Sequence, residues 1–148
     1  MKRLLILKAA PAAYEAMMGL ESYLQNAGIK PEHYDLIKIR ASQINHCAYC
    51  IDKHTRDARE RGEREQRIYL LDAWRETDLF TDEEQAILAL TEEITLIHKG
   101  GVSEATYTKA EQLFGESYLA QLLMAVVTIN AWNRIGVTAD MGRLIEKK

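Results

Sequence analysis

Apolar residues recur every three or four positions along most of the chain, which is the spacing of amphipathic helices. In the first such stretch they are Met17, Leu20 and Leu24. This pattern predicts a helix that ends near Gly28, because glycine favours the backbone turn that follows a helix. A second helix is predicted from Pro31, since proline suits the first helical turn.

The second predicted helix has an ambiguous pattern, because Ile37 and Ile39 also alternate with basic residues. The pattern therefore leaves a short strand open at this point. A third helix is predicted after Cys47 and ends near Gly62. Its charges mostly form pairs of opposite sign four residues apart, which indicates a solvated helix face and not a surface for nucleic acid.

The second half of the chain carries clear helix boundaries. A fourth helix is predicted over residues 68–74. Thr81 and Glu84 form a capping-box signature that opens a fifth helix, and glycines 100 and 101 end it. Ser103 caps a sixth helix that ends near Gly115.

The last long helix begins near residue 117 and is apolar on most of its circumference. Its apolar residues are Leu119, Leu122, Leu123, Val126, Val127 and Ile129. Such a helix lies either at the centre of a domain or between subunits. The sequence therefore predicts an all-α fold with about six to seven helices and a single domain over residues 1–148.

Composition narrows the class of protein. The chain has 148 residues, of which 47% are hydrophobic and 28% charged, as in globular proteins. A net charge of −3 argues against a general nucleic-acid binder. No uncharged apolar stretch reaches about 18 residues, so no membrane span is expected. The apolar run at residues 4–7 is shorter than the roughly 7–15 residues of a secretory signal, and a cytoplasmic protein is expected.

Both cysteines of the chain lie in one short segment, at Cys47 and Cys50, with His54 four residues further on. At 3.6 residues per turn, Cys47 lies about 60° from Cys50 and His54 about 40° from Cys50 around a helix. The three side chains are therefore expected on one face. This spacing predicts a reversible disulfide and a proton exchange between His54 and Cys50.

Thiol chemistry requires a thiolate, whereas a free cysteine with a pKa of about 8.5 is mostly protonated at neutral pH. The positive end of a helix favours a thiolate at Cys47, and the imidazole of His54 favours one at Cys50. The sequence leaves this choice open. A thiolate that attacks a peroxide becomes a sulfenic acid, and a second thiol nearby condenses with it into a disulfide.

Two other interpretations use the same cysteines. In the first, the two cysteines are half of a zinc site, which His54 and one of His33, His46 or His98 complete. It is disfavoured because a second C-x-x-C is absent and four ligands are hard to place on one helix face. A pair of inert core cysteines is the other, and the histidine at the fourth following position argues against it.

The segment D-L-I-K-I-R-A-S-Q-I-N-H-C-A-Y-C at residues 35–50, followed by His54, closely resembles the alkylhydroperoxidase AhpD-like family within the carboxymuconolactone decarboxylase superfamily. The likeness extends through residues 62–67, 71–77, 88–92 and 129–134, and it covers the chain from about Pro11 to about Arg134. A bare C-x-x-C is weak evidence of kinship. The upstream R-A-S-Q-I-N run and the distant I-N-A-W-N-R run make the likeness specific.

The resemblance implies an all-helical homo-oligomer, often a trimer or hexamer, with thiol-dependent peroxidase activity and no metal or organic cofactor. It also implies a dihydrolipoamide- or thioredoxin-like dithiol reductant. In the family, a glutamate twelve residues before the first cysteine and the histidine form a water-linked proton relay to the second cysteine. Carried over, Cys50 is the peroxidatic thiol, Cys47 the resolving thiol and His54 the relay base, and Asp35 stands at the glutamate position.

Two positions depart from the family pattern. Asp35 has a reach shorter than glutamate by about 1.5 Å, so the relay needs an extra water or runs more slowly. Its other interpretation is a surface carboxylate. His46 stands where close relatives usually have glycine, and it either adds a titrating group beside the thiol or shields the thiol.

Two other functions stay open. A carboxymuconolactone decarboxylase or other lactone-processing enzyme is one, and the two thiols argue against it because that chemistry does not depend on a C-x-x-C pair. A non-catalytic redox sensor is the other, in which the same disulfide forms without turnover.

Overall fold

The computed structural model describes residues 3–145, and every regular element in this range is a helix. The α-helices are α1 (Ile6–Ala9), α2 (Pro11–Gln25), α3 (Pro31–Ile44), α4 (Ala48–Glu60), α5 (Glu65–Leu70), α6 (Asp82–Thr95) and α7 (Glu104–Thr138). Short 3-10 helices are η1 (Leu71–Glu76), η2 (Ile97–Lys99) and η3 (Met141–Leu144). The predicted all-α fold with six to seven helices is confirmed.

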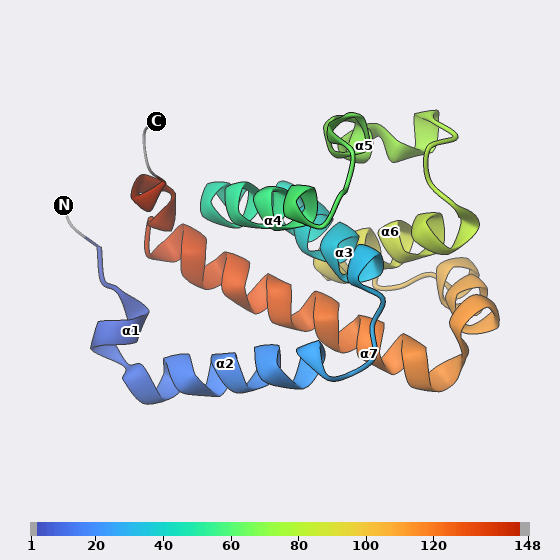
Figure 1. Cartoon of the computed structure of the whole chain (residues 1–148). Coiled ribbons are helices and arrows are strands. Elements are labelled where there is room, and N and C mark those ends of the chain that lie inside the picture. Colours follow the sequence, from blue (N-terminus) through green and yellow to red (C-terminus); the bar gives the residue numbers. More distant parts are fainter. Residues whose placement is uncertain (1–2, 146–148) are drawn as a thin grey trace.

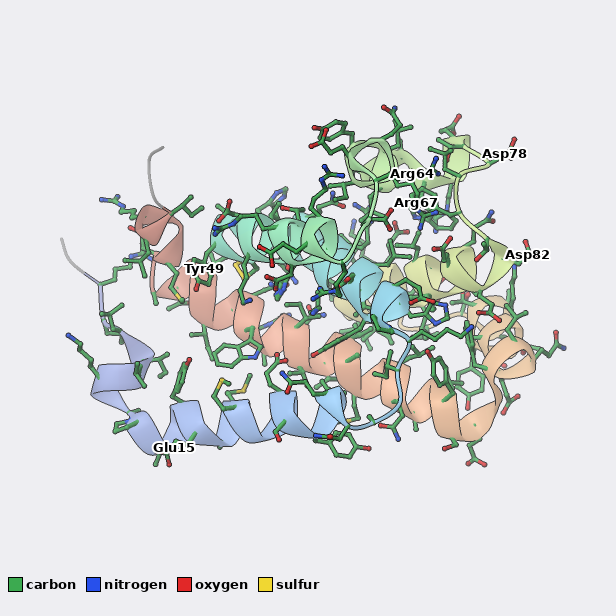
Figure 2. All side chains as sticks on the ribbon, in the orientation of Figure 1. Glu15, Tyr49, Arg64, Arg67, Asp78 and Asp82 are labelled. Atoms are coloured by element: carbon green, nitrogen blue, oxygen red, sulfur yellow. A yellow bond between two sulfur atoms is a disulfide. The ribbon has the colours of Figure 1, made fainter. Side chains whose placement is uncertain are left out.

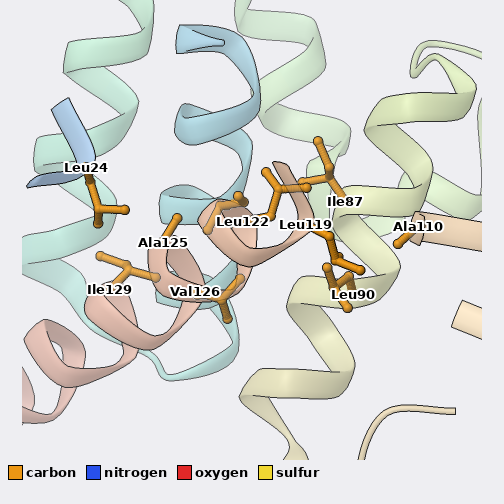
Figure 3. Close-up of a cluster of buried hydrophobic side chains, with 11 residues drawn as sticks. Leu24, Ile87, Leu90, Ala110, Leu119, Leu122, Ala125, Val126 and Ile129 are labelled. Carbon is orange, nitrogen blue, oxygen red and sulfur yellow. The ribbon is translucent and has the colours of Figure 1, made fainter. Parts of the chain in front are cut away.

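The main part of α7 runs through the middle of the molecule (Figure 1), with α2 along one side and α3 and α4 on the other. Helices α3 and α6 both pack against α7. The larger core cluster (Figure 3) joins Leu24 of α2, Ile37 of α3, Leu90 of α6, and Leu122 and Ile129 of α7. The last helix therefore takes the central place that its apolar circumference predicts.

Helix α3 is buried on two sides, which explains its ambiguous sequence pattern. Ile37 packs in the cluster around α7, whereas Leu36 and Ile39 pack with Trp74 and Leu88 in a second cluster. A helix between two cores needs apolar residues beyond a single stripe. The short strand left open at residues 37–39 does not form, because these residues lie inside α3.

Helix α7 is interrupted at Gly115, whose φ of 70° and ψ of 163° are not helical. The predicted helix break at this glycine is confirmed, since only glycine adopts such a conformation without strain. By length and composition α7 could cross a membrane, a test that the core helix of a soluble protein also passes. Leu123 and Val127 on its outer face are each 44% exposed.

The predicted fourth helix over residues 68–74 is wrong in its bounds, because α5 begins at Glu65 and gives way at Leu71 to the 3-10 helix η1. The two predicted helix caps are confirmed. The Thr81 hydroxyl accepts a hydrogen bond from the Glu84 amide, and the Glu84 carboxylate accepts one from the Thr81 amide. At the start of α7, the Ser103 hydroxyl accepts from the Thr106 amide. Such caps satisfy amides that have no partner inside the helix.

Candidate functional site

The turn between α3 and α4 places the first cysteine. The His46 amide donates to the Gln43 carbonyl (3.1 Å) and the Cys47 amide to the Ser42 carbonyl (3.0 Å), which is the hydrogen-bond pattern of a Schellman motif. The motif puts His46 in the left-handed region with a φ of 54°. Glycine suits this conformation better than histidine does. The side chain of His46 is exposed.

A chain of side-chain hydrogen bonds, two part-buried and one buried, fixes this turn to α7. The Asn45 amide group donates to the Oδ1 atoms of Asn130 and Asn133, both at 2.9 Å. Asn133 in turn donates to the Ser42 hydroxyl at 2.9 Å. The R-A-S-Q-I-N and I-N-A-W-N-R runs, about 85 residues apart, therefore contact each other. Sequence analysis singled out both runs but assigned no role to these polar side chains.

Cys47 and Cys50 form a disulfide, with Cα atoms 5.3 Å apart. Cys47 is the N-cap residue of α4, and Cys50 lies in its first turn. Gly136 of α7 closes the other side: a Cβ atom there would lie 2.9 Å from the Cys47 sulfur and 3.4 Å from the Cys50 sulfur. Sequence analysis missed Gly136, because nothing in the pattern of the last helix marks a glycine against the thiols.

A cavity of about 580 Å³ lies beside the disulfide, lined by residues of α2, α3, α4, α7 and η3. Cys50 is among its lining residues and Cys47 is not. Apolar and aromatic lining residues are Tyr14, Met18, Leu24, Tyr49, Trp132 and Met141, and titratable ones are Glu21, Asp35, Lys38, Lys53, His54, Asp57 and Arg61. Figure 2 marks the position of Tyr49 near the start of α4. Ligands in the cavity therefore reach one sulfur of the pair.

His54 lies on the cavity wall, one helical turn after Cys50. Its Nδ1 atom is buried and has no hydrogen-bond partner. Burial, helped by the positive charges of Lys38 and Lys53, lowers the pKa of His54 to about 3. The imidazole is therefore neutral near neutral pH, and one of its ring nitrogens carries an unprotonated lone pair.

Asp35 is buried on the same wall and forms an ion pair with Arg61. One carboxylate oxygen accepts from Arg61 Nε at 2.8 Å, and the other accepts from Arg61 Nη2. The ammonium of Lys38 lies 3.5 Å from Asp35 and 4.0 Å from the centre of the Tyr34 ring. Burial lowers the pKa of Lys38. Asp35 thus lines the cavity with Cys50 and His54, but its hydrogen bonds go to Arg61.

The other histidines lie outside this arrangement. His33 is buried, and its Nδ1 atom lies 2.9 Å from the Tyr118 hydroxyl. Within residues 3–145, no three His, Cys, Asp or Glu side chains are grouped as metal ligands. The ligand set considered for zinc is therefore not assembled in the described part of the chain.

The chain is similar to a known protein family and to individual proteins. Residues 10–93 match the model of the carboxymuconolactone decarboxylase family. An uncharacterised protein, YdfG of Bacillus subtilis (strain 168), is 44% identical over 128 residues, which are 86% of this chain and 87% of that protein.

A solved structure is also similar to this chain. It is the crystal structure of a protein of unknown function from Agrobacterium tumefaciens, described as a candidate antioxidant defence protein AhpD. It superposes with a TM-score of 0.89 at 36% identity and covers 93% of this chain and 94% of its own. By sequence and by its AhpD-like all-α fold, the chain belongs to the carboxymuconolactone decarboxylase family.

Proposed function

We propose that this protein is a thiol-dependent peroxidase of AhpD-like type that reduces hydroperoxides through a Cys47/Cys50 dithiol–disulfide cycle. The observation that carries the proposal is that Cys50 and His54 line one cavity, whereas Cys47 lies behind them against α7. A substrate in the cavity therefore meets Cys50 first. Family membership and the antioxidant description of the Agrobacterium protein support the same function.

The reaction begins with the reduced protein. Neutral His54 takes the proton of the Cys50 thiol, and the thiolate attacks one peroxide oxygen. The O–O bond breaks, the leaving alkoxide takes the proton from His54 and departs as an alcohol, and Cys50 becomes a sulfenic acid. The Cys47 sulfur then bonds to the Cys50 sulfur, and the hydroxyl leaves with the Cys47 proton as water. Asp35, at the position of the family glutamate, belongs to the relay through water.

The cycle closes when an external dithiol is oxidised to its disulfide. Its two electrons and two protons return Cys47 and Cys50 to thiols. A dihydrolipoamide- or thioredoxin-like donor is proposed from the family, together with a cytoplasmic location. The exposed apolar residues Leu123 and Val127 suit a contact between copies in a homo-oligomer, a trimer or hexamer of one-domain subunits.

The test compares peroxide consumption by the wild type, Cys50→Ser and Cys47→Ser with an excess of dithiol. The wild type is expected to turn over, and Cys50→Ser to lose activity. After one equivalent of hydroperoxide, mass spectrometry of Cys47→Ser is expected to find a sulfenic acid on Cys50. Peroxide consumption by Cys50→Ser at the wild-type rate contradicts the proposal.

The same assay separates the two other functions. One equivalent of peroxide consumed without recycling by any dithiol identifies a redox sensor. Turnover of carboxymuconolactone by a variant that lacks both cysteines identifies a decarboxylase.

A further inference from the structure

We infer that Asp57 is the positioning residue that holds His54 in its reactive tautomer, an assignment that rests on the proposed function of the same site. Asp57 follows His54 by three residues on α4, and its Oδ2 atom lies 3.6 Å from His54 Nδ1. That nitrogen is buried without a hydrogen-bond partner. A buried polar atom of this kind requires a partner, and the Asp57 carboxylate faces it.

The separation is slightly too long for a hydrogen bond in the disulfide form. Hydrogen bonds at catalytic sites are often long before the reactive state forms and shorten within it. The contact needs to close by only a few tenths of an ångström, which is within the range of a side-chain adjustment. We therefore place the hydrogen bond from Nδ1–H to Asp57 in the reduced protein.

Asp35 and Asp57 differ in what already binds them. Both oxygens of Asp35 accept hydrogen bonds from Arg61. Asp57 is held from its own helix by Lys53, at 2.8 Å from Oδ2. Burial alone would raise the pKa of Asp57, but the hydrogen bond and charge of Lys53 lower it, so the carboxylate stays ionised. Asp57 is thus a charged acceptor beside His54, whereas Asp35 is committed to the guanidinium.

The chemical consequence concerns the tautomer of His54. A proton on Nδ1, donated to Asp57, leaves the lone pair of Nε2 to take the Cys50 proton. The carboxylate then stabilises the imidazolium that forms, as the aspartate of a catalytic triad does. Charged groups on the surrounding elements are Glu21 of α2, Asp35 and Lys38 of α3, and Lys53, Asp57 and Arg61 of α4, while α7 contributes uncharged Trp132 and Gly136.

Nitrogen-15 NMR of the reduced protein tests this assignment directly, because the ring-nitrogen shifts distinguish the two neutral tautomers. The wild type is expected to carry the proton of His54 on Nδ1, and Asp57→Asn to move it largely to Nε2. Asp57→Glu is expected to restore the wild-type tautomer in part. Asp52→Asn is the matched control, because this carboxylate lies on the same helix with similar exposure but pairs with Arg56 outside the cavity lining, and the tautomer is expected to stay as in the wild type.

The rate at which iodoacetamide alkylates Cys50 gives a second readout, measured from pH 5 to 9 in a Cys47→Ser background. Asp57→Asn is expected to slow alkylation at pH 7 by about tenfold or more, with the profile displaced to higher pH, and Asp57→Glu to recover most of the rate. An unchanged tautomer with a rate within twofold of the wild type overturns the assignment. So does a tautomer change in Asp52→Asn.

Neither readout requires turnover. A wild type that fails to consume peroxide therefore removes the proposed function, whereas an Nδ1–H tautomer that depends on Asp57 survives that result. Since Asp57 is partly exposed, Asp57→Asn is expected to fold, and its unfolding curve checks this.

Discussion

Two largely buried side chains, Glu92 and His54, each 12% exposed, differ in whether their polar atoms have hydrogen-bond partners. The Glu92 carboxylate accepts hydrogen bonds from Arg40 Nε (2.8 Å), Trp74 Nε1 (2.9 Å) and Arg75 Nη1 (2.5 Å). His54 Nδ1 has none. Glu92 binds three elements of the fold together, whereas His54 borders a cavity. A satisfied network holds structure, whereas the unsatisfied Nδ1 atom of His54 is the one to which we assign Asp57 as partner in the reduced protein.

The pKa directions agree with this contrast. Burial alone would raise the pKa of Glu92, but hydrogen bonds from Trp74, Arg75 and Arg40 lower it and keep it charged. At His54 burial dominates, and the imidazole stays neutral. Arg67, labelled in Figure 2, repeats the first pattern: it binds Glu63 at 2.9 Å and Glu84 at 2.5 Å. Glu92 and Arg67 therefore stabilise the fold through their hydrogen bonds.

Glu92→Ala tests whether the hydrogen bonds of Glu92 stabilise the fold, and it has the largest expected effect. Loss of the carboxylate leaves the Nε group of Arg40, which is 11% exposed, and the indole N–H of Trp74 without their acceptor. The free energy of unfolding in urea is expected to fall by about 3–5 kcal/mol. Asp72→Ala is the control, because this 77%-exposed carboxylate also binds Arg40 but is expected to cost less than about 1 kcal/mol. Equal losses in the two variants would contradict the contrast.

His54→Gln tests how the titration of His54 affects the pH dependence of the free energy of unfolding. The folded protein holds the pKa of His54 near 3, below the 6.5 of the unfolded chain, so its neutral form contributes stability above pH 6.5 that is lost as pH falls toward 3. Between pH 7.5 and 5 the wild type is expected to lose about 2 kcal/mol through this group. His54→Gln removes this part of the pH dependence. Parallel urea-unfolding profiles for the two proteins would show that His54 titrates normally.

Gly136→Ala asks how closely α7 must approach the sulfurs. An added Cβ atom would lie 2.9 Å from the Cys47 sulfur, so about 1–3 kcal/mol of overpacking is offset by about 1 kcal/mol of helix propensity. A net loss of up to about 2 kcal/mol in the free energy of unfolding in urea is expected. Gly19→Ala in α2, where a Cβ meets nothing within 4 Å, is expected to gain up to about 1 kcal/mol. A stabilised Gly136→Ala would mean that the contact is loose.

The sequence was sufficient for the parts of this fold that local chemistry decides. Helix periodicity, the Thr81 cap and the Gly115 break each depend on residues a few positions apart. The C-x-x-C-x-x-x-H spacing likewise indicated a disulfide and a nearby histidine, because one helical segment carries all three. The structure confirms the Cys47–Cys50 disulfide, which could be predicted because both cysteines lie within one short segment.

The contacts at the site that could not be predicted are between residues far apart in the sequence. Gly136 meets the sulfurs from a helix almost ninety residues away, and Asn133 reaches Ser42 across a similar separation. The ion pair of Asp35 with Arg61 joins two helices, so the spacing from Asp35 to Cys47 could not reveal it. The charges of the helix after Cys47, Asp57 among them, predict only a solvated helix face, because the contact of Asp57 with His54 is recognised only once both residues are placed at the cavity.

The smallest expected effect compares two turns of the same type. Helix α3 ends in a Schellman motif with His46 at a φ of 54°, and α4 ends in one with Gly62 at a φ of 98°, where the Glu63 amide donates to the Ala58 carbonyl at 2.9 Å. A side chain in the left-handed region costs about 1–2 kcal/mol, while glycine costs about 0.5–1 kcal/mol in chain entropy. His46→Gly is therefore expected to raise the free energy of unfolding by about 0.5 kcal/mol.

Gly62→His is the reverse change and is expected to lose a similar or larger amount, since nothing lies within 4 Å of a Cβ there and only the backbone conformation opposes it. Urea unfolding of the two variants and the double variant measures both terms. If the difference between the turns is conformational, the two effects have opposite signs and add in the double variant. A His46→Gly variant that is less stable than the wild type would contradict the prediction, because it would mean that the strain at His46 is smaller than the chain entropy that glycine costs.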